Sequence, residues 1–187
     1  MQRLFIGIKI TCPESIINLQ EQLQHLLQRS TIKWVEPDNF HLTMKFLGDV
    51  ESHIITPLIQ VLEHLAPKFN QFVLQSDGLG TFGKSNNPHI IWYGFKENPI
   101  LSFLQTKIEK TLHQLGFESD EKKFSPHLTL GRIKFLVERK ELALFLQKQD
   151  HIPDHYQIQN FQLVESILKK EGPVYKTIKS FQLNKNN

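Results

Sequence analysis

The chain has 187 residues, of which 40% are hydrophobic and 22% charged, and its formal net charge at pH 7 is +3. This balance excludes an intrinsically disordered chain, because there is enough apolar material for a sizeable core. The mild basicity is compatible with a phosphate-bearing partner but does not identify one, since nucleic-acid-binding domains usually carry a clustered basic stripe.

The first half of the chain alternates between strand and helix patterns. Its first apolar run is followed by Pro13, which suits the first position of a helix. The predicted elements are a buried strand over 4–10, a helix over 13–27, a short strand over 33–35, a strand through HLTMKF that Gly48 and Asp49 end, and a helix over 54–69.

The second half continues the alternation. We expect a strand over 72–76, a Gly-, Asn- and Pro-rich loop over 77–88, a strand over 89–95, a helix over 100–115 capped by Gly116, a strand from 127, a helix over 138–149, and strands over 161–168 and 174–183 joined by a hairpin turn. Interleaved elements with a short hairpin favour an α+β fold with antiparallel sheets over a doubly wound α/β fold.

The single cysteine and the lack of long apolar runs bear on location. Cys12 alone cannot form an internal disulfide, which fits a reducing compartment. No apolar stretch approaches the roughly 20 residues needed to cross a bilayer, and the opening MQRLFIGIKITCPE has no signal-peptide cleavage site. We therefore expect a cytoplasmic protein with no membrane association.

The most informative feature is the tripeptide His-Leu-Thr, which occurs at positions 41–43 and again at 127–129, 86 positions later. Both copies lie in strand-type surroundings, NFHLTMKFLG and SPHLTLGRIKF. Because residues i and i+2 of a strand point to the same side, each copy places an imidazole beside a hydroxyl. If the copies face each other across a groove, the set can perform acid–base chemistry on a phosphate without a metal.

The residues between and after these polar positions should form the buried face. On strict alternation this face holds Leu42, Met44 and Phe46 in the first copy, and Leu128 and Leu130 in the second. The separation of the copies is far longer than a solenoid repeat, and it indicates two lobes related by a pseudo-twofold axis.

The other histidines and the tryptophans carry less information. A lone strand histidine is usually structural; those at 25, 53, 64 and 113 lie on predicted helices and should face solvent, and His89 begins a strand. The segment HIPDH at 151–155 has zinc-like spacing, but Pro153 disfavours the helix that would align its imidazoles, so we interpret it as a surface loop. We expect no metal site. Trp34 and Trp92 lie in apolar strands and are expected in the core.

Longer segments around the repeated tripeptide resemble a known family. These are QRLFIGI, WVEPDNFHLTMKFLGDV, GLGTFGKSNNPHIIWYG, FSPHLTLGRI and LVESILKKEGPVYKTIKSFQL. They are similar to the bacterial and archaeal RNA 2′,3′-cyclic phosphodiesterases, the LigT-like or 2′-5′ RNA ligase family of the 2H phosphoesterase superfamily. The resemblance covers nearly the whole chain.

The resemblance implies one bilobal domain over 1–187, with two lobes of antiparallel sheet and outer helices around a central cleft. It implies metal-independent hydrolysis of RNA 2′,3′-cyclic phosphodiester ends to 2′-phosphomonoesters without a cofactor, with ATP-independent 2′-5′ joining in some members. The expected partner is RNA with 2′,3′-cyclic phosphate ends, bound by a monomer.

The same resemblance assigns roles to five residues. His41 maps to the proton donor and His127 to the proton acceptor, while Thr43 and Thr129 map to the phosphate-binding hydroxyls. Arg132 occupies the place of an arginine that follows the second motif.

Two other functions remain open on the sequence. A 2H phosphodiesterase acting on 2′-5′ oligonucleotides or small cyclic nucleotides would carry the same motifs and differ only in its cleft walls. A non-catalytic RNA-binding module is disfavoured, because the aromatic signature of an RRM sheet is absent.

Arg132 presents a conflict between pattern and resemblance. Strict alternation from His127 puts Thr129 and Gly131 on the cleft face and Arg132 on the back, where it would pair with an acidic side chain. The resemblance requires it near the phosphate. A bulge at Gly131 would reconcile the two, because glycine inside a strand often marks one.

Overall fold

The computed structural model describes residues 1–187 except 12, 85–86, 121–122, 149–152, 170–171 and 186–187. Its described helices are α1 (Glu14–Leu26), α2 (Ser52–Leu65), α3 (Pro99–His113) and α4 (Arg139–Gln147), with 3₁₀ turns at η1 (Pro37–Asn39) and η2 (Ala66–Lys68). Its described strands are β1 (Gln2–Lys9), β2 (Thr31–Trp34), β3 (His41–Val50), β4 (Phe72–Lys84), β5 (Asn87–Phe95), β6 (His127–Phe135), β7 (His155–Ile158), β8 (Asn160–Leu168) and β9 (Pro173–Gln182).

The strands of the described residues form one curled sheet of nine, ordered β7-β4-β5-β6-β3-β1-β8-β9, with β2 paired to a further stretch of β6. Every pairing between these strands is antiparallel. The predicted α+β fold with antiparallel sheet is therefore confirmed. The two motif strands, β3 and β6, are neighbours at the centre of the order.

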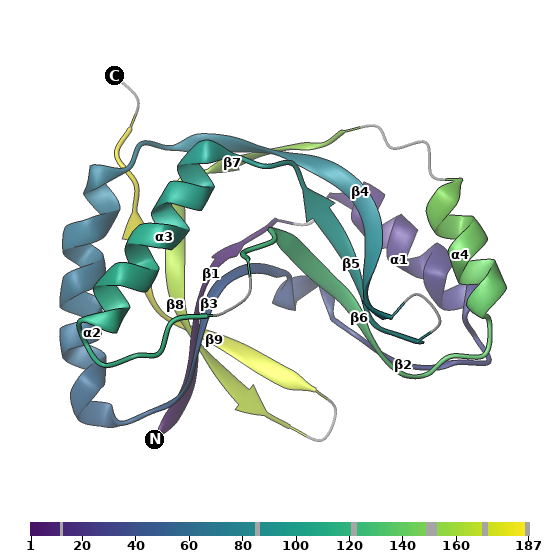
Figure 1. Ribbon diagram of the computed structural model, residues 1–187, viewed down its shortest axis with the longest axis horizontal. Coiled ribbons are helices and arrows are strands. Elements are labelled where there is room, and N and C mark those ends of the chain that lie inside the picture. The colour runs from purple at the N-terminus through teal and green to yellow at the C-terminus, as the bar shows by residue number, and fades with distance from the viewer. Residues whose placement is uncertain (12, 85–86, 121–122, 149–152, 170–171, 186–187) are drawn as a thin grey trace.

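The helices lie in two pairs at opposite ends of the molecule, α2 with α3 and α1 with α4 (Figure 1). Each pair combines one helix from each half of the chain. Helix α3 follows β5 in sequence yet contacts β3, and α1 follows β1 yet reaches β6 through Gln20. The two halves of the chain are thus interlocked rather than placed side by side.

Helix α3 shows how local sequence sets an element and its buried face. Asn98 caps its start by accepting a hydrogen bond from the Leu101 amide at 3.0 Å, and Pro99 needs no donor at the first position. Four leucine and isoleucine side chains spaced three or four residues apart are buried along one stripe: Leu101, Leu104, Ile108 and Leu112. Beyond the helix, Gly116 has a φ of +86°, as expected of a glycine that terminates a helix.

The segment over 77–88, predicted as a loop, is instead part of a long hairpin. Strand β4 continues to Lys84, and β5 begins at Asn87. The glycines that indicated a loop serve the sheet: a Cβ at Gly80 would overlap the indole of Trp92 on the neighbouring strand. Gly78 and Gly83 have positive φ, which is compatible with the register shifts between β4 and β5.

Two other boundaries also differ from prediction. Strand β3 does not end at Gly48 and Asp49 but continues to Val50, with Gly48 at a φ of +70°. His155, placed in a surface loop, begins strand β7, which pairs with β4. His151 and Cys12 lie outside the described residues. In the described part of the chain, no helix is long and apolar enough to cross a membrane.

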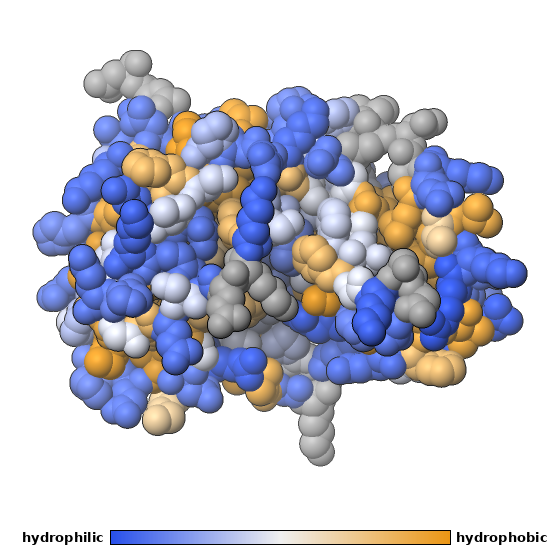
Figure 2. All heavy atoms as spheres, viewed as in Figure 1, coloured by the Kyte–Doolittle hydropathy of each residue, from blue (hydrophilic) through white to orange (hydrophobic). Residues whose placement is uncertain are grey.

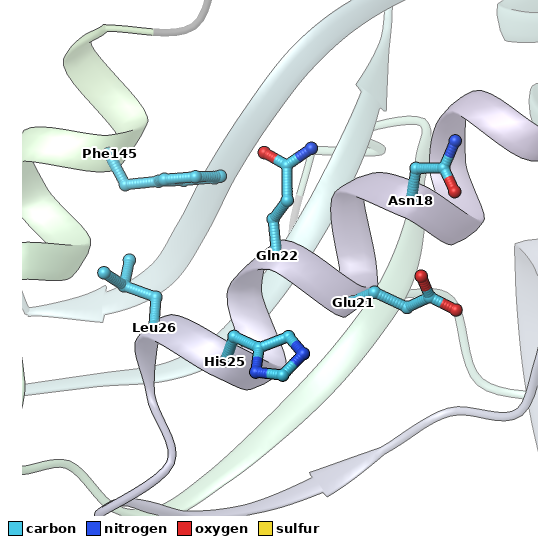
Figure 3. Close-up of a pocket in the computed structure, with 6 residues that line it drawn as sticks. All are labelled: Asn18, Glu21, Gln22, His25, Leu26 and Phe145. Atoms are coloured by element: carbon cyan, nitrogen blue, oxygen red, sulfur yellow. The ribbon is translucent and has the colours of Figure 1, made fainter.

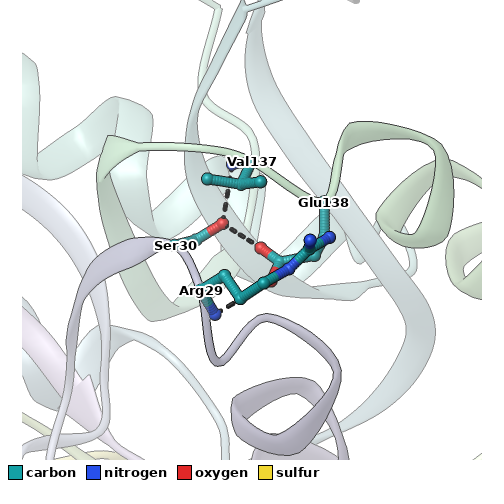
Figure 4. Close-up of polar contacts among 4 residues, drawn as sticks. All are labelled: Arg29, Ser30, Val137 and Glu138. Carbon is teal, nitrogen blue, oxygen red and sulfur yellow. Dashed lines mark hydrogen bonds and ion pairs between the residues drawn. The ribbon is translucent and has the colours of Figure 1, made fainter.

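A buried carboxylate ties the end of α1 to the start of α4 (Figure 4). The Glu138 side chain accepts hydrogen bonds from the Arg29 amide at 2.8 Å, from Arg29 Nε at 3.1 Å and from the Ser30 hydroxyl. The Ser30 oxygen in turn accepts from the Val137 amide at 2.8 Å. These contacts join segments more than 100 residues apart in the chain.

Candidate active site

The two motif strands meet at their leucines. Leu42 of β3 and Leu128 of β6 are directly opposed in an antiparallel pair, and both side chains are fully buried. Opposed residues of a pair share a face of the sheet, so both leucines point into the core from the same side. The imidazoles and hydroxyls on either side of them therefore share the opposite face.

Continuing this antiparallel pairing by one residue in each direction crosses the two motifs. His41 then lies opposite Thr129, and Thr43 lies opposite His127. A pseudo-twofold axis between the leucines relates the two pairs. The structure thus brings together the four motif residues that the sequence singled out, as two imidazole–hydroxyl pairs on one surface.

Each motif strand carries one extra residue directly after its threonine. The β1–β3 register passes from Ile6↔Lys45 to Gly7↔Thr43 and leaves Met44 over. The β5–β6 register passes from Ile91↔Gly131 to Trp92↔Thr129 and leaves Leu130 over. These irregularities occupy the same position in both copies, and each shifts the alternation of side chains beyond it by one.

In β3 the shift exchanges the places of Lys45 and Phe46. Lys45 is 3% exposed, while Phe46 is 58% exposed. The expectation that Phe46 joins Leu42 and Met44 on the buried face is therefore wrong, because strict alternation does not hold across the extra residue.

In β6 the same shift moves Arg132 to the histidine side. Ile133 beyond it packs against the core, so Arg132 points the other way. Its charge helps to lower the pKa of His127 and acts on Tyr175 as well. Arg132 forms no ion pair with any described residue. The expected irregularity is thus present one residue before Gly131, at Leu130.

Buried polar side chains hold both irregular positions, and the sequence analysis did not identify them. Gln20 of α1 is 4% exposed and donates hydrogen bonds from Nε2 to the carbonyls of Val35 at 2.8 Å and Leu130 at 3.0 Å. Gln20 lies on the buried side of a helix that otherwise buries apolar residues, so periodicity alone gives no reason to select it.

The corresponding contact in the first copy runs from the strand to α3. Lys45 Nζ lies 3.1 Å from Glu109 Oε2 on α3 and 3.1 Å from Asp120 Oδ1, and it donates to the Glu118 carbonyl at 2.7 Å. Each motif strand is therefore fastened at or next to its extra residue to the helix that crosses from the other half of the chain.

Both imidazoles are oriented in the same way. His41 Nδ1 donates to the Asn39 carbonyl at 3.1 Å, and His127 Nδ1 donates to the Ser125 carbonyl at 2.7 Å. Because a carbonyl can only accept, this contact leaves Nε2 of a neutral ring as the acceptor. His41 Nε2 is buried and has no hydrogen-bond partner among the described residues.

Burial lowers the pKa of both histidines, but their remaining neighbours differ. For His41, burial is followed by the Asn39 carbonyl, which raises the pKa, the Lys9 charge, which lowers it, and the Gln162 side chain, which raises it. For His127, burial is followed by the Ser125 carbonyl, which raises the pKa, and the Arg132 charge, which lowers it. The pseudo-symmetric pair is therefore electrostatically asymmetric.

Aromatic rings flank His41 on the cleft face. The ring of Phe5 meets it edge-on at 5.7 Å, and the ring of Tyr175 does so at 5.4 Å. Tyr175 comes from β9, so the C-terminal hairpin contributes directly to the site. Sequence reasoning missed these residues, because only the long-range pairing of β1 with β3 and β8 brings them to His41.

Two further rings flank His127. Phe82 lies edge-on at 4.7 Å between centroids, and Trp92 lies at 6.5 Å. Trp92 is half-buried and opposed to Thr129, which places it on the cleft face rather than in the core as predicted. Trp34, also only half-buried, packs against the core as expected.

The remaining titratable candidates lie away from this surface. The histidines at 25, 53, 64 and 113 are exposed on helices, as predicted. In the part of the chain that the structure describes, no group of three or more His, Cys, Asp or Glu side chains converges to hold a metal ion.

The molecule also has a shallow hollow of about 730 Å³ on its outer surface between α1 and α4 (Figure 3). It is lined by Asn18, Glu21, Gln22, His25, Leu26 and Phe145. None of the five predicted site residues lines it. On the face shown in Figure 2, hydrophilic side chains predominate and hydrophobic ones lie in smaller groups among them.

A curled antiparallel sheet that opposes two His-x-Thr strands defines a phosphoesterase of the 2H type. The chain belongs to the LigT like phosphoesterase family, whose model matches residues 6–92 and 97–175.

Individual relatives extend over nearly the whole chain. An RNA 2′,3′-cyclic phosphodiesterase of Methanocaldococcus jannaschii is 31% identical, with 96% of this chain and 99% of the relative covered. One of Thermotoga maritima is also 31% identical, with 94% and 92% covered. Among solved structures, TT0787 of Thermus thermophilus has a TM-score of 0.76 at 24% identity, covering 99% of this chain and 100% of its own. Apo LigT of E. coli has a TM-score of 0.72 at 23% identity, with 98% of each covered. These two structures share the fold.

Proposed function

We propose that this protein is an enzyme that hydrolyses RNA 2′,3′-cyclic phosphodiester ends to 2′-phosphomonoesters. The observation that carries the proposal is the opposition of Leu42 and Leu128, which sets two imidazole–hydroxyl pairs on one surface. The names of relatives about 30% identical over most of the chain support the same activity.

In the proposed reaction the cyclic phosphate lies between the two motifs. The Thr43 and Thr129 hydroxyls donate hydrogen bonds to its non-bridging oxygens, where negative charge must be held as phosphorus is attacked. Neutral His127 takes a proton from a water whose oxygen bonds to phosphorus. The bond from phosphorus to the 3′-oxygen breaks, and the His41 imidazolium protonates that oxygen. The phosphate remains on the 2′-oxygen.

The asymmetry of the two histidines supports this assignment of base and acid. The Arg132 charge beside His127 disfavours its imidazolium and so favours a neutral base. The Gln162 side chain acts in the opposite direction on His41 and favours the charged acid, against the opposing charge of Lys9. The guanidinium of Arg132 is also placed to bind phosphate oxygens in a bidentate manner.

The proposal extends to the biological unit. Residues 1–187 act as one bilobal catalytic domain, as a cytoplasmic monomer without a cofactor. If the 5′-hydroxyl of a second RNA bonds to phosphorus in place of water, the same groups join two RNA ends through a 2′-5′ linkage without ATP.

The decisive experiment measures hydrolysis of 2′,3′-cyclic nucleotides and RNA ends in saturating EDTA, with the products separated as 2′- or 3′-phosphates. We expect full turnover and 2′-phosphates only. Loss of activity on chelation with recovery on adding a divalent ion would overturn the two-histidine mechanism. Cleavage of 2′-5′ oligonucleotides, with cyclic ends left intact, would instead favour the alternative substrate.

A further inference from the structure

Three basic side chains form a row on the cleft face beside His127. Lys33 of β2 is directly opposed to Arg132 of β6, so both share one face of the sheet. Lys134 follows two residues after Arg132, and the intervening Ile133 packs against the core. Lys134 therefore points to the same side as Arg132. We call Lys33, Arg132 and Lys134 the basic ledge.

The cations of the basic ledge are not neutralised by the protein. All three side chains are exposed, and none forms an ion pair with a described residue. By contrast, Lys45 and Lys179 are each held by a carboxylate at 3.1 Å or closer. Like charges in a row repel each other, and an anion that spans them relieves that repulsion.

The ledge extends away from the position of the reacting phosphate. Arg132 is close enough to His127 to affect its pKa, and Lys134 lies about 7 Å further along the strand. On the other bank is the tip of the β8–β9 hairpin, where a Cβ on Gly172 would lie 3.5 Å from Lys33 Cε. The row therefore continues from the site as a channel that a mononucleotide would leave unfilled.

We propose that the basic ledge binds the sugar–phosphate backbone of a polynucleotide that extends beyond the reacting phosphate. The inference rests on the proposed function and narrows its substrate from any 2′,3′-cyclic phosphate to one on an oligonucleotide. Two strands have this chemistry: the RNA that bears the cyclic phosphate, and a second RNA that presents a 5′-hydroxyl.

The test compares Lys33→Gln/Lys134→Gln with a matched control, Lys140→Gln/Lys148→Gln, which removes two exposed lysines of the α4 region. Substrates are a 2′,3′-cyclic mononucleotide and an oligoribonucleotide ending in a 2′,3′-cyclic phosphate. We expect the ratio of kcat/KM for the oligonucleotide to that for the mononucleotide to fall about tenfold in the ledge variant only. The slope of log KM against log salt should decrease by about 0.7 for each lysine–phosphate ion pair that the substitutions remove.

A second arm identifies the strand. An oligoribonucleotide with a 5′-hydroxyl and no cyclic phosphate is titrated as an inhibitor at several salt concentrations. If the ledge variant alters only this inhibition, the ledge holds the second strand; if it alters the KM of the cyclic-ended oligonucleotide, the ledge holds the substrate itself. If neither changes, the inference is wrong. If the wild-type protein opens no cyclic phosphate, the proposed function fails separately, and the salt slope of oligonucleotide binding still tests the ledge.

Discussion

His41 and His127 act in the proposed mechanism as one unit, since each proton transfer is useful only if the other occurs. We therefore predict that His41→Ala and His127→Ala each lower kcat, by about 10²–10⁴-fold or more for the missing proton transfer. The double variant should be little worse than either single variant. Single-turnover rates on a cyclic mononucleotide measure this, and multiplicative losses in the double variant would show that the residues work independently.

The pKa values of the same residues set an expected pH dependence. Protonation of His127 removes the base at low pH, and deprotonation of His41 removes the acid at high pH, which gives a bell-shaped profile of kcat/KM. Both pKa values are lowered from 6.5, chiefly by burial. We therefore expect the maximum on the acid side of 6.5. A profile that rises or falls monotonically from acid to alkaline pH would contradict the pairing.

Arg132 provides a second test at this scale. Arg132→Lys keeps the positive charge but loses the planar fork, so KM should rise about tenfold while the acidic limb stays in place. Arg132→Gln removes the charge as well, which should raise the pKa of His127 and move the acidic limb to higher pH. Identical pH profiles for the three proteins would separate Arg132 from His127.

The sequence predicted the four motif residues because their placement depends on local alternation alone. It did not predict Gln162, Phe5 or Tyr175, which reach His41 only through pairings between distant strands. It could pose the Arg132 problem but not resolve it, since an extra residue in a strand leaves no periodic signal.

At the scale of elements, helices followed their apolar spacing closely, whereas glycine-rich strands did not follow composition. The segment over 77–88 has the residues of a loop, yet its glycines make room for Trp92 and permit register shifts within a hairpin. The same strand context concealed the extra residues Met44 and Leu130, which decide the side on which later residues lie.

The contact from α1 to β6 carries an element-scale prediction. Gln20→Met fills a similar volume but leaves the Val35 carbonyl without one donor and the Leu130 carbonyl without another. We expect a loss of about 1–3 kcal/mol in the free energy of unfolding and a higher KM, because Arg132 follows the loosened position. Denaturant unfolding and steady-state kinetics test this.

Gln24→Met is the matched control, because Gln24 is exposed on the same helix. It should change neither quantity. Equal stability and KM for Gln20→Met, Gln24→Met and wild type would mean that β6 keeps its extra residue without help from α1.

At the scale of the whole molecule, Glu138 joins two segments 109 residues apart. Glu138→Ala should lower the free energy of unfolding by about 1–3 kcal/mol or more, because the Ser30 hydroxyl and the Arg29 amide lose their acceptor. Arg29→Ala should cost less, since that side chain is 66% exposed and its ion pair is screened by water. Thermal unfolding measures both, with the exposed Glu141→Ala as control. A larger loss for Arg29→Ala than for Glu138→Ala would contradict this ranking.

The crossing of α1 and α3 between the halves of the chain also constrains the order of folding. A half that folds early presents one imidazole without its opposite and one strand without the helix that fastens it. Closing the sheet between Leu42 and Leu128 requires contacts far apart in the chain, and such closures are slow. Turnover during refolding should therefore appear only with the last docking step, after most secondary structure has formed.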